Sequence, residues 1–184
     1  EEYNSICENV SRPKVGVVGE IYLKFNSFAQ RNIVDWLVEQ HIEVVPPVLT
    51  DFFMQAFVNR KAKVTAHIEK RQISDYLLRL GYRLVRSEIR KVNKICSSFC
   101  HFTPFGDIFH EAKLAEKVIT LNAQFGEGWL LPAEIMSYVE NGVKSVISLQ
   151  PFGCIANHIV SKGIEKRLKA LYPAINLLSL DFDS

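Results

Sequence analysis

Two strand–helix–strand units, one near each end of the chain, constrain the fold most. Residues 14–19 form a β-branched run bounded by glycine, which predicts a strand buried on both faces. A helix capped by Asn26 or Ser27 follows, and residues 43–47 supply a second strand that ends at prolines. The same order of elements returns over residues 143–183. We therefore expect an α/β fold of the Rossmann or flavodoxin type, with a four-stranded parallel sheet in the order 2-1-3-4 and right-handed crossovers.

The middle of the chain is predicted to be helical. Residues 51–142 show a period near 3.6 and almost no strand signal, which predicts a long helical insertion between strands 2 and 3. Further helices are expected over residues 109–124 and 132–141, with Pro132 in a first helical turn. One apolar face of the insertion is followed by Ile73, Leu77, Leu80, Leu84 and Ile89. A length of 184 residues suits a single α/β domain over residues 1–184 that contains this insertion.

Positive charge is concentrated within the insertion. Residues 59–94 contain eleven lysines and arginines against three acidic residues, a net charge of +8, so the rest of the chain carries −6. Three interpretations remain open: a solvated helix face, a site for the phosphates of a nucleotide or coenzyme A, and a nucleic-acid surface. Aromatic residues are sparse among these charges, and no nucleic-acid motif is present. One face of the basic region is followed by Arg79, Arg83, Arg86 and Arg90.

Composition excludes several classes of protein. No apolar run approaches 18 residues, and the first 20 residues lack the pattern of a signal peptide. We therefore expect a cytoplasmic protein without a membrane partner. Four scattered cysteines are too few for a disulfide scaffold, so we expect reduced thiols. Because the sequence opens on Glu1 and stops directly after a predicted strand, we also expect it to be part of a larger protein.

Cys154 is the strongest candidate for chemistry. Residues 145–154 run from an apolar strand into a Pro/Gly turn that delivers this cysteine to the start of a helix. The free N–H groups and the dipole of a helix start favour a thiolate. Ligands of parallel α/β sheets bind at the carboxyl ends of the strands, where this turn is placed. His158 follows on the same helix, as a base or as a capping or packing residue.

Two other groups of residues have local chemistry. Gly126 and Gly128 surround Glu127 and allow backbone conformations that present this carboxylate in a cleft. The alternative is a helix end, with Gly126 as the residue beyond the helix. The second group is either a zinc site or a set of small buried side chains at the end of a helix, and it consists of Cys96, Cys100, His101 and His110.

Three segments carry a resemblance to a known family. Residues 19–26 read GEIYLKFN, residues 126–134 read GEGWLLPAE, and residues 149–158 read LQPFGCIANH. They are similar to the 2-hydroxyacyl-CoA dehydratase-related family, and more specifically to the dehydratase-like part of large CoA-substrate-specific enzyme activase proteins. The similarity extends over most of the chain, from about residue 13 to residue 183.

The resemblance implies an iron–sulfur protein. In the dehydratase subunits three cysteines from two α/β domains hold a 4Fe–4S cluster, and Cys154 matches one of these ligands. Glu127, Asn157 and His158 are then expected to line the cluster pocket or to hydrogen-bond to its sulfur atoms. The other ligands would come from a preceding domain, since no other cysteine of this chain falls in a matching motif. The isolated chain is therefore expected to be metal-free and inactive.

The resemblance also implies a reaction and partners. An ATP-dependent activase would inject one low-potential electron into the cluster, and a CoA ester would then lose its β-hydroxyl group. The expected partners are this activase and the remaining domains of the protein, with no nucleic acid. This chain has Gly153-Cys154-Ile155 where the catalytic subunits have Cys-Asp/Glu-Pro. The alternatives are a noncatalytic interaction or regulatory domain that docks the activase through the arginine face, and a small-molecule-binding α/β module in which Cys154 is structural.

Overall fold

The central element of the protein is a four-stranded parallel sheet, in a computed structural model that describes residues 2–7, 10–46 and 48–183. The strand order is β2-β1-β3-β4, so the predicted order 2-1-3-4 is confirmed. The register pairs Val15 of β1 with Val44 of β2 and with Ser145 of β3. The strands are β1 (Lys14–Gly19), β2 (Glu43–Val45), β3 (Ser145–Pro151) and β4 (Asn176–Phe182).

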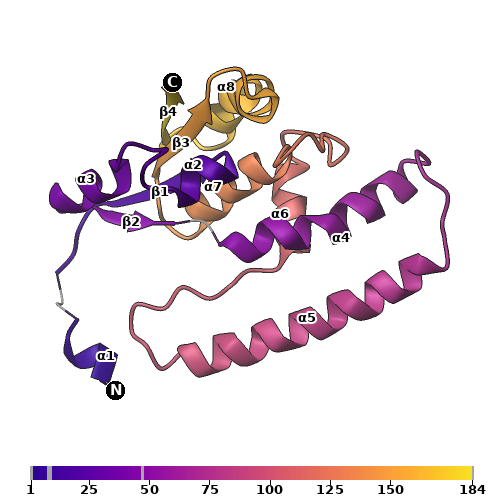
Figure 1. The fold of residues 1–184 in the computed structure, drawn as a ribbon, viewed down its shortest axis with the longest axis horizontal. Helices are drawn as coiled ribbons and strands as arrows, with labels where there is room; N and C mark the ends of the chain where they lie inside the picture. Colours follow the sequence, from indigo (N-terminus) through magenta and orange to yellow (C-terminus); the bar gives the residue numbers. More distant parts are fainter. Residues whose placement is uncertain (1, 8–9, 47, 184) are drawn as a thin grey trace.

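Helices cover both faces of the sheet (Figure 1). Neighbouring residues of a strand point to opposite faces. Val17 accordingly packs with Leu23 of α2, whereas Val18 packs with Ile135 of α7. α2 (Ile21–Phe25) and α3 (Ile33–Glu39) lie on the first face, and α7 (Leu130–Glu140) and α8 (Lys162–Leu171) on the second. The central strand β1 is therefore buried on both faces, as its apolar sequence predicts.

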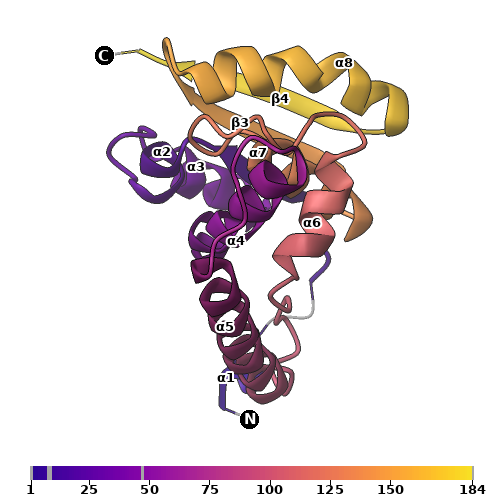
Figure 2. The ribbon, with the colours of Figure 1, turned by 90° about the vertical axis from the view of Figure 1, so that its right-hand side faces the viewer.

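The insertion between β2 and β3 is helical, as predicted. α4 (Leu49–Thr65) runs away from the sheet, and α5 (Ser74–Cys96) runs back beside α4. α6 (Ile108–Ala115) then precedes α7. Figure 2 shows α5 projecting from the body toward the N-terminal α1 (Glu2–Ser5). No residue of α5 is buried. Its predicted apolar face is therefore largely exposed, and only Ile89 of that set packs against the core cluster of α4 and α6.

Two predicted helix boundaries differ from the observed ones. The helix expected directly after Asn26 or Ser27 begins only at Ile33, because Arg31 and Asn32 take positive φ angles of 53° and 54°, and the separate short helix α2 precedes Asn26. The Asn26 side chain accepts from the N–H of Ala29 and caps the turn between these helices. The helix expected over 109–124 ends at Ala115, and a loop continues to α7.

The remaining elements agree with the predicted order. β2 ends at Val45, and Pro47 lies outside the described residues. Pro132 occupies the first turn of α7. The helix after Cys154 begins with a π-helical segment, η1 (Ala156–Ser161), before α8. Within the described part of the chain, each helix is too short or too polar to cross a lipid bilayer.

Candidate functional site

The carboxyl ends of the parallel strands bring three of the four predicted site residues together. Cys154 lies between β3 and η1, and its carbonyl accepts from the N–H of His158 at 2.8 Å. The Asn157 Nδ2 donates to the Cys154 Sγ at 3.1 Å. The Cys154 side chain is half-buried, while the adjacent Phe152 and Ile155 are exposed. The thiol is therefore at the surface of the sheet edge rather than sealed in the core.

His158 is held in one orientation by two partners. The Gly153 N–H donates to His158 Nδ1 at 3.0 Å, so Nε2 carries the proton and faces the Asp181 Oδ1 at 3.0 Å. Lys162 Nζ also contacts this carboxylate at 3.0 Å. The hydrogen bonds from Lys162, and then from His158, lower the pKa of Asp181. This network ties the Cys154 turn to the end of β4.

Glu127 lies at the neighbouring strand end, and it is buried. Its Oε1 accepts from the backbone N–H of Ile21 at 2.8 Å, at the first residue of α2. Gly128 allows this loop to close, because a Cβ there would lie 2.0 Å from the carbonyl oxygen of Ala123. Gly126 does take the left-handed conformation, with a φ of 57°, but it lies in a loop and not at a helix end.

The Glu127 loop and the Cys154 turn meet at this edge. A Cβ on Gly126 would lie 3.6 Å from the Cβ of Ala156, in ordinary contact. Two of the three segments that carry the family resemblance are therefore packed against each other. The third, residues 19–26, is joined to Glu127 by the Ile21 hydrogen bond.

Buried polar atoms without partners lie on β3 and η1. Gln150 and Asn157 are fully buried. Among the described residues, no group hydrogen-bonds to either amide atom of Gln150, to the Asn157 Oδ1 or to the Ser148 hydroxyl. Such groups are rare in folded proteins and call for a water or ligand partner. Sequence reasoning identified Asn157 but missed Gln150, whose place at the end of an apolar strand was the available signal.

A second polar cluster, missed by sequence reasoning, lies beneath α7. Lys24 Nζ pairs with the Glu134 Oε1 at 3.0 Å, and both side chains are buried. Burial, and then the charge of Glu134, raise the pKa of Asp51 to about 7. Burial, and then the charge of Asp51, raise the pKa of Glu111 to about 8. Burial also raises the pKa of Glu134, against the effect of Lys24. The available signal was Glu134 within the apolar run of α7.

The other cysteines lie outside the Cys154 turn. The ligand atoms of Cys7, Cys100 and His101 lie within 4.8 Å of one another, in the segments that follow α1 and α5, and Figure 1 shows α1 apart from β3. Asn4 joins α1 to this turn by hydrogen bonds with Ser98 and Cys100. His110 instead pairs with Glu140, so it does not join the predicted cysteine group.

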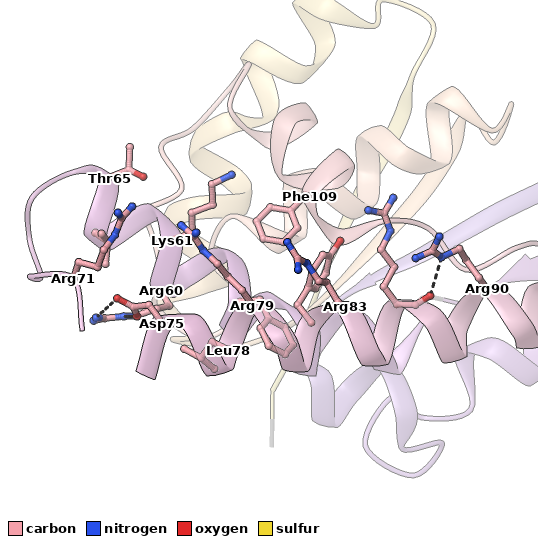
Figure 3. A pocket seen from close by; sticks show the side chains of 14 residues that line it. Arg60, Lys61, Thr65, Arg71, Asp75, Leu78, Arg79, Arg83, Arg90 and Phe109 are labelled. Atoms are coloured by element: carbon pink, nitrogen blue, oxygen red, sulfur yellow. Dashed lines mark hydrogen bonds and ion pairs between the residues drawn. The ribbon is translucent and has the colours of Figure 1, made fainter. Parts of the chain in front are cut away.

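The arginine face of the insertion lines a cleft (Figure 3). This cleft has a volume of about 450 Å³ and lies between α4, α5 and the start of α6. Its lining includes Arg79, Arg83, Arg86 and Arg90, the four arginines singled out in the sequence. A second cavity, of about 700 Å³, lies beside β2 and α3. Among the described residues that line these two cavities, Cys154 is absent.

Comparisons with known proteins identify no relative. No family model matches the chain, and neither a curated protein nor a solved structure matches it. A function for this chain is therefore inferred from its fold and from the geometry of its polar residues.

Proposed function

We propose that this chain is a domain of an iron–sulfur protein related to the CoA-ester dehydratases and their activases. In this proposal Cys154 contributes one thiolate ligand to a 4Fe–4S cluster. One observation carries it: the Cys154 thiol lies half-exposed at the carboxyl edge of a parallel sheet and accepts an N–H from Asn157 at 3.1 Å. Hydrogen bonds to ligand sulfur are among the features that set the potential of such clusters.

The donor set at this edge fits one ligand of a cluster. A thiolate is the ligand that iron–sulfur clusters use, and Cys154 supplies one. The described cysteines Cys7 and Cys100 group with His101 and not with Cys154. The remaining ligands would therefore come from other domains of the protein. The buried Asn157 Oδ1 and the Gln150 amide have no partner in the described chain, which is consistent with a group bound at this edge.

The residues around Cys154 have defined roles in this proposal. Asn157 donates to the ligand sulfur and so stabilises its negative charge. His158 is a positioning residue, because its ring joins the backbone of Gly153 to Asp181 and fixes the turn. Glu127 holds the loop that packs against η1. When bound, the cluster would supply one-electron reduction at low potential.

The partners follow from the same proposal. An ATP-dependent activase would deliver the electron, and a CoA ester would be the substrate of the complete protein. We place this chemistry in the cytoplasm, where thiolates remain reduced. The noncatalytic alternative retains the scaffold but requires no metal ligand at Cys154. Iron binding at Cys154 therefore distinguishes this alternative from the iron–sulfur proposal.

Reconstitution of the full-length protein with iron and sulfide tests the ligand assignment. We expect Cys154→Ser to lose visible cluster absorption and bound iron. Cys96→Ser is the matched control, because this half-buried cysteine ends α5 and does not join the Cys154 turn. Circular dichroism of both variants checks that the fold is retained. Equal iron content in Cys154→Ser and the wild-type protein would rule out the assignment and favour the noncatalytic alternative.

A further inference from the structure

We propose that the cleft between α4 and α5 binds a small ligand that carries two or more phosphate groups. The cleft lies in the helical insertion, and its chemistry does not involve Cys154. This inference therefore stands or falls independently of the iron–sulfur proposal.

The lining of the cleft is strongly basic. One carboxylate, that of Asp75, faces seven cationic side chains among the described residues. The four arginines of α5 recur at intervals of four, three and four residues, which places them on one face of the helix over a length of about 16 Å. The cations are Arg60, Lys61, Arg71, Arg79, Arg83, Arg86 and Arg90.

Two of these cations are already paired. Arg60 contacts Asp75 at 2.5 Å and also pairs with Glu69, and the Arg86 Nη2 lies 2.6 Å from the Asp107 Oδ2. The others have no ion pair with a described carboxylate, and they are Lys61, Arg71, Arg79, Arg83 and Arg90. Like charges gathered in one cleft repel one another, and a bound anion removes that cost.

The cations without an ion pair to a described carboxylate come from α4, from α5 and, in Arg71, from the segment that joins these helices. Lys61 of α4 places its Nζ 4.9 Å from the centre of the Phe109 ring. Figure 3 shows Arg79 and Arg83 of α5 directed toward the same region as Lys61 and Phe109. Guanidinium groups form paired hydrogen bonds to phosphate oxygens, and lysine adds a point charge. The arrangement therefore suits several phosphates held close together.

An aromatic wall closes the cleft on its inner side. The Tyr82 ring lies 4.9 Å from Phe109 and 5.6 Å from Phe57, and its hydroxyl donates to Asp107 at 2.9 Å. These contacts fix the rings against one another. They provide an apolar surface beside the phosphate donors, which suits the organic part of a ligand.

The shape of the cleft favours a small ligand over a macromolecule. Its volume of about 450 Å³ lies within the usual range for small-molecule sites. Surfaces for single-stranded nucleic acid present aromatic faces on which successive bases stack. Here Tyr82 and Phe109 pack edge to face, with 86° between their planes, so they do not form a row of parallel faces on which successive bases could stack.

Titration calorimetry with inorganic tripolyphosphate and ATP tests the proposal. We expect saturable binding of one molecule per chain, weaker at higher salt. The double variant Arg79→Gln/Arg83→Gln should bind at least about tenfold more weakly, and Lys61→Gln should weaken binding in the same direction. Lys166→Gln is the matched control, because it removes one exposed positive charge on α8, outside the cleft, and should leave the affinity unchanged. Circular dichroism verifies the fold of each variant.

The two probes distinguish the source of the phosphates. Tighter binding of ATP assigns a nucleotide-like ligand, and equal or tighter binding of tripolyphosphate assigns a ligand recognised through its phosphates alone. Either result supports the proposal if the cleft variants weaken the binding and Lys166→Gln does not. Absence of saturable binding, or equal losses in the cleft variants and in Lys166→Gln, would overturn it. So would tighter binding of a single-stranded oligonucleotide or of polyglutamate than of both small probes.

Discussion

The side-chain amide of Asn157 donates a hydrogen bond to the thiol sulfur of Cys154, with 3.1 Å between Nδ2 and Sγ. The two residues are three positions apart, and η1 begins between them. Because an N–H donor favours negative charge on sulfur, this contact connects the fold to the proposed ligand role. It also leads to a prediction that requires no metal.

Asn157→Leu should slow the alkylation of Cys154. The substitution removes the N–H donor but keeps a side chain of similar size, so the thiolate loses a stabilising contact and reacts severalfold more slowly near neutral pH. The measurement is the rate of iodoacetamide modification at each cysteine, followed by mass spectrometry. Cys96 of the same protein is the internal reference. An unchanged rate at Cys154 would show that the contact does not influence the sulfur.

Lys24→Met should destabilise the protein strongly. It leaves Glu134 buried without its cation, and breaking a buried pair in this way costs about 3–5 kcal/mol. Unfolding in denaturant measures the loss, and adding Glu134→Gln to Lys24→Met should recover part of it. The control is Lys169→Met in the exposed pair with Glu165, where the cost is below about 1 kcal/mol. Similar losses for both lysines would contradict the account of the buried pair.

Stability should fall as the pH rises from about 4 to about 8. The pKa values of Asp51 and Glu111 are raised to about 7 and about 8 in the folded protein, so the folded state binds more protons than the unfolded state across this window. Their contribution to stability is fully present when the pH is below the pKa values of the unfolded state. It is lost as the pH rises through the pKa values of the folded state. The expected fall in the free energy of unfolding is several kcal/mol, since one unit of pKa shift corresponds to about 1.4 kcal/mol.

Asp51→Asn and Glu111→Gln together should flatten this pH dependence. Glu116→Gln is the control, because it makes the same kind of carboxyl-to-amide change at an exposed residue at the end of α6. Denaturant unfolding at about pH 5 and about pH 8 supplies the comparison. A double variant with the wild-type slope would mean that these carboxyl groups do not titrate within this range.

Gly19→Ala should be far more damaging than Gly163→Ala. At Gly19 the φ angle is 130° and a Cβ would lie 2.1 Å from the carbonyl oxygen of Leu149, so β1 and β3 would have to separate. The expected cost is about 3 kcal/mol or more. A Cβ on Gly163 meets nothing within 4 Å, and alanine in α8 should add about 0.5 kcal/mol. Thermal unfolding of both variants tests the contrast, and equal losses would contradict it.

The sheet was predictable because its signals are local. β1 and β3 are apolar runs that end at glycine or proline, and the two strand–helix–strand units admit few parallel topologies. The place of Cys154 at a strand end follows from the same pattern. Helix boundaries were less predictable. Arg31 and Asn32 take positive φ angles, but the apolar helical pattern around them is a stronger signal than their residue types.

The polar interior could not be predicted from spacing. Lys24 and Glu134 are 110 positions apart, and their pairing depends on how α2 and α7 sit on the sheet. Gln150 lies in a run of apolar residues, yet the structure buries it without a partner in the described chain. The arginine face was recognisable from its period, but its concave shape depends on the path of α5 beside α4.

Mass spectrometry of cysteine protection tests the central claim most directly. The full-length protein would be alkylated before and after reconstitution with iron and sulfide, and the modified fraction would be quantified at each cysteine. If Cys154 ligates the cluster, its modification falls to a small fraction of the metal-free value, while Cys96 is modified equally in both states. Equal modification of Cys154 in a protein that has gained a full complement of cluster iron would contradict the claim.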